Sequence, residues 1–305
     1  MSASASQIVQ QLTDHARGIA QDRKSALAEF ICPSVLVGAA TGKFKSFSDK
    51  NAFQVMDTSR AIGGPARRLE FEATDPDYNC TPNGLEIGID DHERELAGDG
   101  DSMLEEAKVE TLVQTAVNSH ESRAFNAVAA AVPAVAGRGV WSSADNDPVK
   151  EINEQIAAIA TAMGAMPNRI VFGLAAWQVF RDHPKVVARQ PGAPIVGLTY
   201  AGAASMLLNP DTEIRVGILS KDSAKFGAGR NVSNIIGPEV YIFYASPTPT
   251  LFDNSFAKTF RMGGGGVDSV TRYRDDRCSS DILKLNWSVD VQVVSPLCAK
   301  RLTVS

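Results

Sequence analysis

Within the region from Ile282 to Val294, residues Leu283 to Val293 alternate strictly between apolar and polar side chains. A period of two predicts a β-strand with one face on a core and the other in water or against a partner. An ordinary strand has about 5 to 6 residues, whereas this one would span roughly 40 Å at about 3.3 Å per residue. The apolar positions of this long strand are Leu283, Leu285, Trp287, Val289, Val291 and Val293.

A helix of similar length is predicted from Ser102 to Val132. The segment has no internal Gly or Pro, and Pro133 follows it. Ser102 and Glu105 have the spacing of a capping box, which places the start of the helix at Ser102. At about 1.5 Å per residue the helix is over roughly 40 Å long. A long helix beside a long strand would form an elongated unit, here called the plank, with a shape suited to tiling a surface.

The chain before the plank helix is less regular. Residues Gln7 to Phe30 carry a weak amphipathic pattern, which predicts one helix in an N-terminal arm. From Thr41 to Gly98, two alternating segments, 67–72 and 85–90, are joined by turn residues and predict a long hairpin-like excursion. It has too little apolar bulk to bury its own face, so we expect a neighbouring subunit to cover it. The candidate interface residues are Leu69, Phe71, Tyr78, Leu85, Ile87 and Ile89.

Helices and strands alternate between the plank helix and the long strand, which predicts an α/β lobe. Asn146-Asp-Pro148 begins a helix that extends to Met163 with Ile152, Ile156 and Ile159 on one stripe. Further helices are predicted over 174–182 and 199–208, and strands over 169–172, 213–219 and 239–244. The tetraglycine 263–266 is expected to be a connector. It precedes a strand over 267–274 that pairs with the long strand.

The bulk composition is that of an ordinary globular protein, with 305 residues of which 44% are hydrophobic and 21% charged. The net charge of -5 argues against strong nonspecific DNA affinity, which depends on clustered Lys and Arg, and leaves room for weak contact. No stretch approaches the roughly 20 apolar residues of a membrane helix, and no signal peptide is evident at the start, so we expect a cytoplasmic protein without a membrane partner. The four cysteines are scattered, which favours reduced thiols.

Two segments come near to sequence motifs of catalytic or binding sites. Gly38-Ala-Ala-Thr-Gly-Lys43 resembles a phosphate loop, but its glycines are too close together and Phe44 stands where Ser or Thr is needed. His92-Glu93 begins like a zinc-protease helix, but Leu96 occupies the position of the second His. We therefore expect no catalytic residues, no bound cofactor and no metal site.

The order of parts along the chain resembles the major capsid proteins of tailed bacteriophages, whose shell fold also occurs in herpesvirus capsid floors and encapsulins. The similarity extends over nearly the whole chain and rests on several short motifs of low individual specificity that occur in the expected order. These are Thr41-Gly-Lys-Phe-Lys, Asp49-Lys50, Tyr78-Asn-Cys80, Leu85-Glu86, Ile89-Asp90, Met166-Pro-Asn-Arg-Ile-Val-Phe-Gly173, His183-Pro184, Arg272-Tyr-Arg-Asp-Asp276, Ser280-Asp281, Trp287-Ser288 and Val293-Val-Ser-Pro296.

The resemblance implies an α+β fold: an N-terminal arm (1–38), an extended loop (39–98), a peripheral domain with its spine helix (99–168), an axial α/β domain (169–252), the returning peripheral strands (253–295) and a C-terminal segment (296–305). The implied function is a structural one, the self-assembly of hexamers and pentamers into an icosahedral shell around double-stranded DNA. Implied partners are further copies of the chain, a scaffolding protein, a portal, a decoration protein and packaged DNA in weak contact, with assembly in the host cytoplasm and a final place in the virion. An encapsulin-type cargo shell and a cytoplasmic α/β enzyme remain the alternatives.

Overall fold

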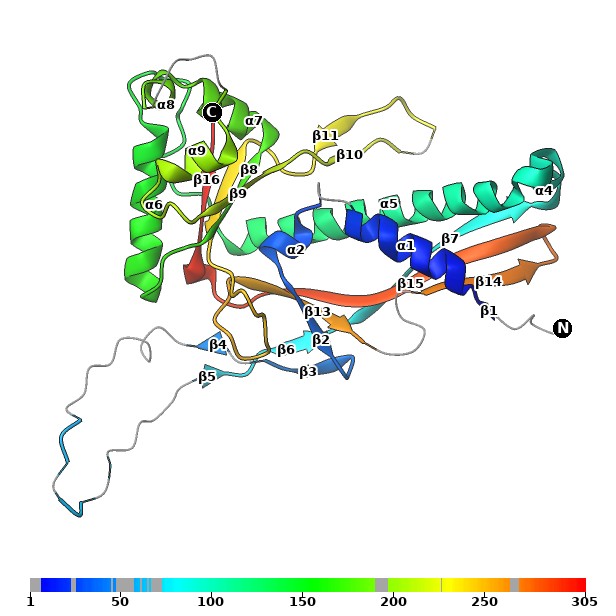
Figure 1. The fold of residues 1–305 in the computed structure, drawn as a ribbon, viewed down its shortest axis with the longest axis horizontal. Helices are drawn as coiled ribbons and strands as arrows, with labels where there is room; N and C mark the ends of the chain where they lie inside the picture. The colour runs from blue at the N-terminus through cyan, green and yellow to red at the C-terminus, as the bar shows by residue number, and fades with distance from the viewer. Residues whose placement is uncertain are drawn as a thin grey trace.

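The computed structural model describes residues 7–22, 26–44, 46–47, 58–60, 62–64, 66, 73–189, 197–225, 227–263 and 269–305. Its helices and strands form an elongated plank, a lobe at one end of the plank, and an excursion that leaves near the lobe (Figure 1). Within the described residues, no helix is both long enough and apolar enough to cross a bilayer.

The plank consists of helix α5 (Asp101–Ala131) and a six-stranded sheet. At about 1.5 Å per helical residue and about 3.3 Å per strand residue, α5 and strand β15 are both roughly 46 Å long, and they run side by side in Figure 1. The sheet order is β1 (Gln7–Ile8), β14 (Ser269–Asp275), β15 (Ser280–Val293), β13 (Ala257–Met262) and β2 (Ser34–Val37), with β7 (Thr81–Asp90) also pairing with β15. The predicted long helix and long strand are confirmed.

The predicted capping box at the start of α5 is wrong. The helix begins at Asp101, after the short helices α4 (Asp91–Ala97) and η1 (Gly98–Gly100), and its N-cap Gly100 has no side-chain cap bond. Ser102 therefore lies inside the first turn. Glu105 forms ion pairs with Arg94 and Arg272 instead, because the β14–β15 hairpin and α4 bring guanidinium groups to it.

The pairing of β7 also differs from the expectation. It was predicted to pair with the segment 67–72, which lies outside the described residues. It pairs instead along its whole length with β15, with Leu85 opposite Leu285 and Ile89 opposite Asp281. Strand β7 thus belongs to the plank sheet, and the described base of the excursion is formed by β3 (Thr41–Lys43) with β6 (Asp77–Asn79) and by β4 (Ser46–Phe47) with β5 (Ala73–Thr74).

The N-terminal segment packs on the plank of its own chain. The single helix predicted over residues 7–30 is wrong: α1 (Gln10–Asp22) and α2 (Ala28–Ile31) are separate helices. Leu12 and Ala16 of α1 are buried in a cluster with Val109 and Leu112 of α5 and Val270 of β14.

The lobe is a four-stranded sheet covered by helices (Figure 1). Its strand order is β16 (Ala299–Thr303), β12 (Glu239–Phe243), β8 (Arg169–Gly173) and β9 (Glu213–Gly217), with β8 and β9 parallel. The predicted stripe of Ile152, Ile156 and Ile159 is fully buried against this sheet. The C-terminal segment supplies β16, an edge strand of the lobe sheet, directly after the 3-10 turn η2 (Pro296–Cys298). The lobe helices are α6 (Pro148–Met163), α7 (Leu174–Asp182), α8 (Pro184–Val187) and α9 (Tyr200–Ser205).

A small hairpin projects from the lobe. Strands β10 (Ser220–Asp222) and β11 (Val232–Asn234) pair only with each other in the described sheets. In Figure 1 the hairpin extends from the lobe above α5, on the opposite side of the plank from the excursion.

Candidate assembly surfaces

The excursion has an aromatic base that fixes it to the plank. The ring of Tyr78 on β6 stacks on the ring of Phe260 of β13, with 4.8 Å between the ring centroids. The ring centroid of Phe44 lies 5.1 Å from that of Phe260. Gly42 lies opposite Tyr78 in the β3–β6 ladder, where a Cβ atom would come within 2.5 Å of the Tyr78 hydroxyl oxygen. Glycine is therefore required there, and the excursion leaves the plank from a packed base.

The six predicted interface residues separate into three groups. Tyr78 and Ile89 are buried within the chain itself. Leu85 and Ile87 are partly buried and pack on the apolar cluster between α5 and the sheet, the same cluster that contains Ile89. Leu69 and Phe71 lie outside the described residues. Tyr78 is covered by Phe260 of β13. Ile89 is covered fully, and Leu85 and Ile87 in part, by the chain's own plank, because β7 belongs to the main sheet.

A network of ion pairs holds the far end of the plank. Arg94 of α4 lies 3.2 Å from Asp101, 3.1 Å from Glu105 and 3.1 Å from Asp281. Arg274 of β14 pairs with Asp91, and its guanidinium holds the pKa of that carboxyl below its usual range. These pairs join α4, the first turn of α5 and the β14–β15 hairpin, so the end of the plank is stiffened by charges from three elements.

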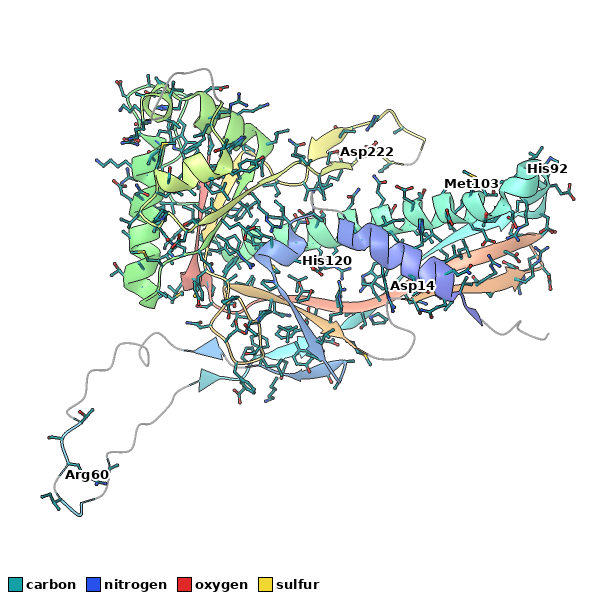
Figure 2. All side chains as sticks on the ribbon, viewed as in Figure 1. Asp14, Arg60, His92, Met103, His120 and Asp222 are labelled. Carbon is teal, nitrogen blue, oxygen red and sulfur yellow. The ribbon has the colours of Figure 1, made fainter. Side chains whose placement is uncertain are left out.

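The same end carries exposed apolar side chains. Leu96 and Met103 are 77% and 73% exposed. Figure 2 places Met103 and His92 together at this end, Arg60 on the excursion and Asp222 on the hairpin. His92 pairs with Glu95 at 3.7 Å, both on the surface of α4. Exposed apolar residues that occur singly are normal on protein surfaces, so Leu96 and Met103 do not by themselves define a contact surface.

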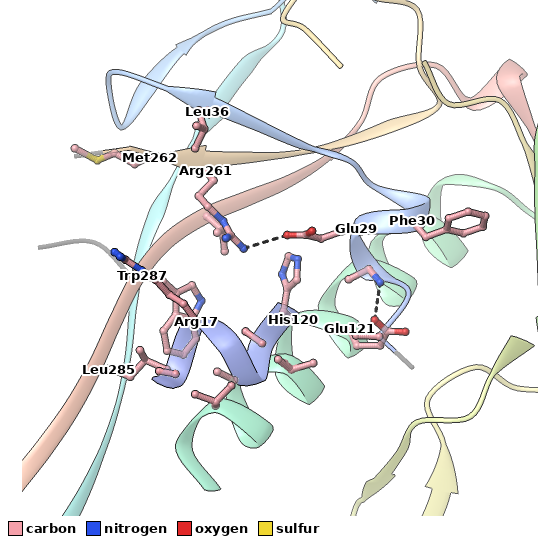
Figure 3. Close-up of a pocket in the computed structure, with 18 of the residues that line it drawn as sticks. Arg17, Glu29, Phe30, Leu36, His120, Glu121, Arg261, Met262, Leu285 and Trp287 are labelled. Atoms are coloured by element: carbon pink, nitrogen blue, oxygen red, sulfur yellow. Dashed lines mark hydrogen bonds and ion pairs between the residues drawn. The ribbon is translucent and has the colours of Figure 1, made fainter. Parts of the chain in front are cut away.

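An open groove of about 830 Å³ lies where α1, α2 and α5 meet the sheet (Figure 3). Its apolar lining includes Leu36, Val117 and Trp287. Glu29 and Arg261, 3.6 Å apart, form part of its wall. The groove thus combines an apolar lining with charged groups.

Two adjacent titratable residues of α5 line this groove: Glu121 is buried and His120 is half-buried. The Glu121 carboxylate accepts backbone N–H bonds from Leu27 at 2.8 Å and Ala28 at 2.6 Å. Burial raises the pKa of Glu121 to about 7, although these bonds oppose the shift. Burial, with Arg261 nearby, lowers the pKa of His120 to about 4. Glu121 was not predicted from the sequence, although a carboxylate between the apolar residues Val117, Ala124 and Phe125 was a usable signal.

The near-motifs occupy positions that suit neither nucleotide nor zinc chemistry. Lys43 ends strand β3, whereas a phosphate loop needs the N-terminus of a helix directly after its Lys. In the described part of the chain, no group of three or more His, Cys, Asp or Glu side chains is arranged to hold a metal ion.

Comparisons with known proteins bear on the fold. The chain is 27% identical over 180 residues to a major capsid protein of Burkholderia phage BcepMu, a match that covers 53% of this chain and 55% of that protein. A phage-related protein from Bordetella bronchiseptica RB50 superposes with a TM-score of 0.74 at 23% identity, over 98% of this chain and 97% of that one. The capsid structure of Cyanophage P-SCSP1u superposes with a TM-score of 0.54 at 10% identity, over 100% of this chain and 90% of that one. The chain has the shell fold of phage capsid proteins.

This shell fold confirms the predicted α+β class and the predicted resemblance. It extends to a holo-SrpI encapsulin complex from Synechococcus elongatus PCC 7942, with a TM-score of 0.56 at 10% identity over 99% of this chain and 92% of that one. The chain spans about half the length of the curated relative that it matches. No family model matches the chain.

Proposed function

We propose that this chain is a major capsid protein of a tailed bacteriophage and that copies of it assemble into the hexamers and pentamers of an icosahedral shell. The observation that supports this most strongly is the shell fold, which extends over 98% of the chain in the superposition on the phage-related protein. The sequence similarity to a phage major capsid protein points the same way. The role is structural, and we propose no catalytic activity for the chain.

In this proposal the plank is the peripheral domain and the lobe is the axial domain at the capsomer centre. The proposed divisions are 1–38, 39–98, 99–168, 169–252, 253–295 and 296–305, although strand β7 joins the second of these to the plank sheet. The excursion reaches a neighbouring subunit, and its contacts include Leu69 and Phe71. Tyr78, Leu85, Ile87 and Ile89 support the excursion and the plank from within the chain.

The proposed partners follow from a DNA-containing shell. Besides further copies of the chain, they are a scaffolding protein, a portal and a decoration protein. The net charge of -5 supports weak contact with packaged DNA, because a strongly basic wall would release many counterions on binding and retain the DNA. Assembly would take place in the host cytoplasm and the product would be the virion capsid.

An encapsulin-type cargo shell is the second candidate. The likeness to the encapsulin complex, with a TM-score of 0.56, is as high as the likeness to a chain of Mycobacterium phage Che8, so the fold alone does not separate the two functions. The contents of the shell do. A capsid protein is found with DNA and a portal, whereas a cargo shell encloses a protein.

Sedimentation of the purified chain, expressed with its neighbouring genes, tests the proposal. We expect closed particles that sediment far ahead of the subunit and release DNA when disrupted. Particles that release only a protein cargo would favour the encapsulin-type function. A strictly monomeric chain under all assembly conditions would contradict both.

A further inference from the structure

The β10–β11 hairpin lies outside the apolar clusters of the described residues. Its ladder has three residue pairs, Ser220 with Asn234, Lys221 with Ser233 and Asp222 with Val232. All three residues of β11 are exposed. None of the apolar clusters in the described residues includes a residue from 220 to 234. An isolated two-stranded hairpin is marginally stable in water, so this one needs a surface to lie on.

The hairpin is nevertheless preformed. At its base, Ile235 N–H donates to the Leu219 carbonyl at 2.9 Å, next to the buried Ile236 of the lobe. Near its tip, the Asp222 carboxylate accepts from Ala224 N–H at 2.9 Å and from Asn231 N–H at 3.0 Å. These bonds lower the pKa of Asp222. The one acidic side chain of the hairpin is thus engaged with the backbone of its own loop.

The cationic side chains of the hairpin are not taken up by ion pairs, although the charge of Arg230 helps to lower the pKa of Asp222. Lys221, Lys225 and Arg230 form no ion pair with a carboxylate of the described residues, and Lys225 and Arg230 are exposed. With Asp222 they give residues 220–234 a net charge of +2 in a chain of net charge -5, which leaves -7 on the rest of the chain. The hairpin is therefore a basic projection on an acidic molecule. Another copy of that molecule is a complementary partner.

We propose that the hairpin docks on a second copy of this chain, where Lys221, Lys225 and Arg230 meet exposed carboxylates. The body of the chain offers such groups: Glu106 and Glu110 on the outer face of α5 are exposed and form no ion pair in the described residues. Ile218 and Val232, 55% and 43% exposed, lie beside the cationic groups and add apolar area to the contact. This inference rests on the proposed self-assembly and assigns the hairpin a place in it.

Zero-length carbodiimide cross-linking of shells assembled from a mixture of ¹⁴N- and ¹⁵N-labelled copies tests the proposal. The reagent joins a Lys amine to a carboxylate in contact with it. We expect mixed-isotope peptides that join Lys221 or Lys225 to Asp or Glu of another copy, found in shells and absent from unassembled subunits. Shells in which these lysines give no link between copies would overturn the inference and leave the proposed shell function standing.

Charge reversal in the hairpin provides a second test of the proposal. K225E/R230E should fold normally, because both side chains are exposed, and should lower shell yield about tenfold by placing like charges together. K225R/R230K keeps the charges and should assemble like the wild type. A normal shell yield with K225E/R230E would contradict the inference. If such shells also retained less DNA than the wild type, the hairpin would be assigned to contact with nucleic acid instead. Failure of the wild type to form any shell would refute the proposed function itself.

Discussion

A buried carboxylate, Glu121, attaches the N-terminal segment to the plank helix. It lies on α5, is fully buried, and accepts backbone N–H bonds from Leu27 and Ala28 at the start of α2. Because its pKa is raised to about 7 from an ordinary value of 4.5, the folded chain holds a proton there between pH 4.5 and 7 that the unfolded chain releases. The attachment of the N-terminal segment is thus coupled to pH.

Between pH 4.5 and 7 this residue makes stability fall as pH rises, since the folded state binds more protons than the unfolded state. Relative to E121Q, which does not titrate, the wild type should lose up to ~3 kcal/mol of unfolding free energy over that range. Urea unfolding at pH 5 and pH 8 measures this. The neighbouring His120 has the opposite slope in both proteins and cancels in the comparison. E106Q changes an exposed residue of the same helix and should show the same pH dependence of the unfolding free energy as the wild type. The claim fails if E121Q also shows that pH dependence.

Lys258 on β13 is a second buried charge with one partner residue. It is fully buried, lies 2.8 Å from an Asp253 carboxylate oxygen and donates to the Asp253 carbonyl at 2.7 Å. K258M removes the cation but leaves the carboxylate, so it should destabilise the fold by about 3 to 5 kcal/mol. D253N/K258M should recover part of the loss. The exposed K150M is the control, and a melting temperature for K258M equal to that of K150M would disprove the role.

At the scale of elements, helix α4 at the far end of the plank has no buried residue and is joined to its neighbours by ion pairs. Arg94 joins Asp101, Glu105 and Asp281, with side-chain exposures of 39%, 13% and 22%. R94A should therefore increase amide hydrogen exchange in α4 and the first turn of α5, at a cost of about 1 to 2 kcal/mol. Exchange in the lobe should not change. R138A, which removes the exposed pair with Glu154, should have little effect at either place, and unaltered exchange in α4 of R94A would count against the network.

The elements themselves were largely predictable from residue patterns. The long strand, the long helix and α7 follow directly from periodicity and from proline positions, because these signals are local. The partner of β7 was not predictable, because Leu85, Ile87 and Ile89 fit any sheet with an apolar face. The capping box failed for a similar reason: Glu105 has the right spacing, but arginines from other elements bind it.

At the scale of the whole molecule, the proposed contacts of the excursion are decisive for assembly. L69S/F71S should leave the subunit folded, because the lobe has its own core around Ile152, Ile156 and Phe172. Shell formation should fail, since loss of a buried Leu or Phe typically costs about 2 to 5 kcal/mol and recurs at every subunit. Circular dichroism with sedimentation tests this against L208S, a control at an exposed lobe position. Normal mutant shells, or an unfolded subunit, would contradict it.

The candidate surfaces were less predictable than the fold. Alternation identified the apolar faces of the excursion and of β7 but not which molecule covers them, because sequence does not distinguish burial within a chain from burial between chains. The structure shows that Ile89 is covered by its own α5 and sheet. The hairpin at 220–234 escaped prediction because its strands are short and polar and lack periodicity.

The most direct measurement of the central claim is a cryo-electron microscopy reconstruction of particles formed by this chain. We predict closed icosahedral particles built of pentamers and hexamers, with each subunit fitted by the plank and lobe described above and with the excursion lying across an adjacent subunit. Open aggregates, or discrete small oligomers in which the plank and lobe form no capsomer, would contradict the account.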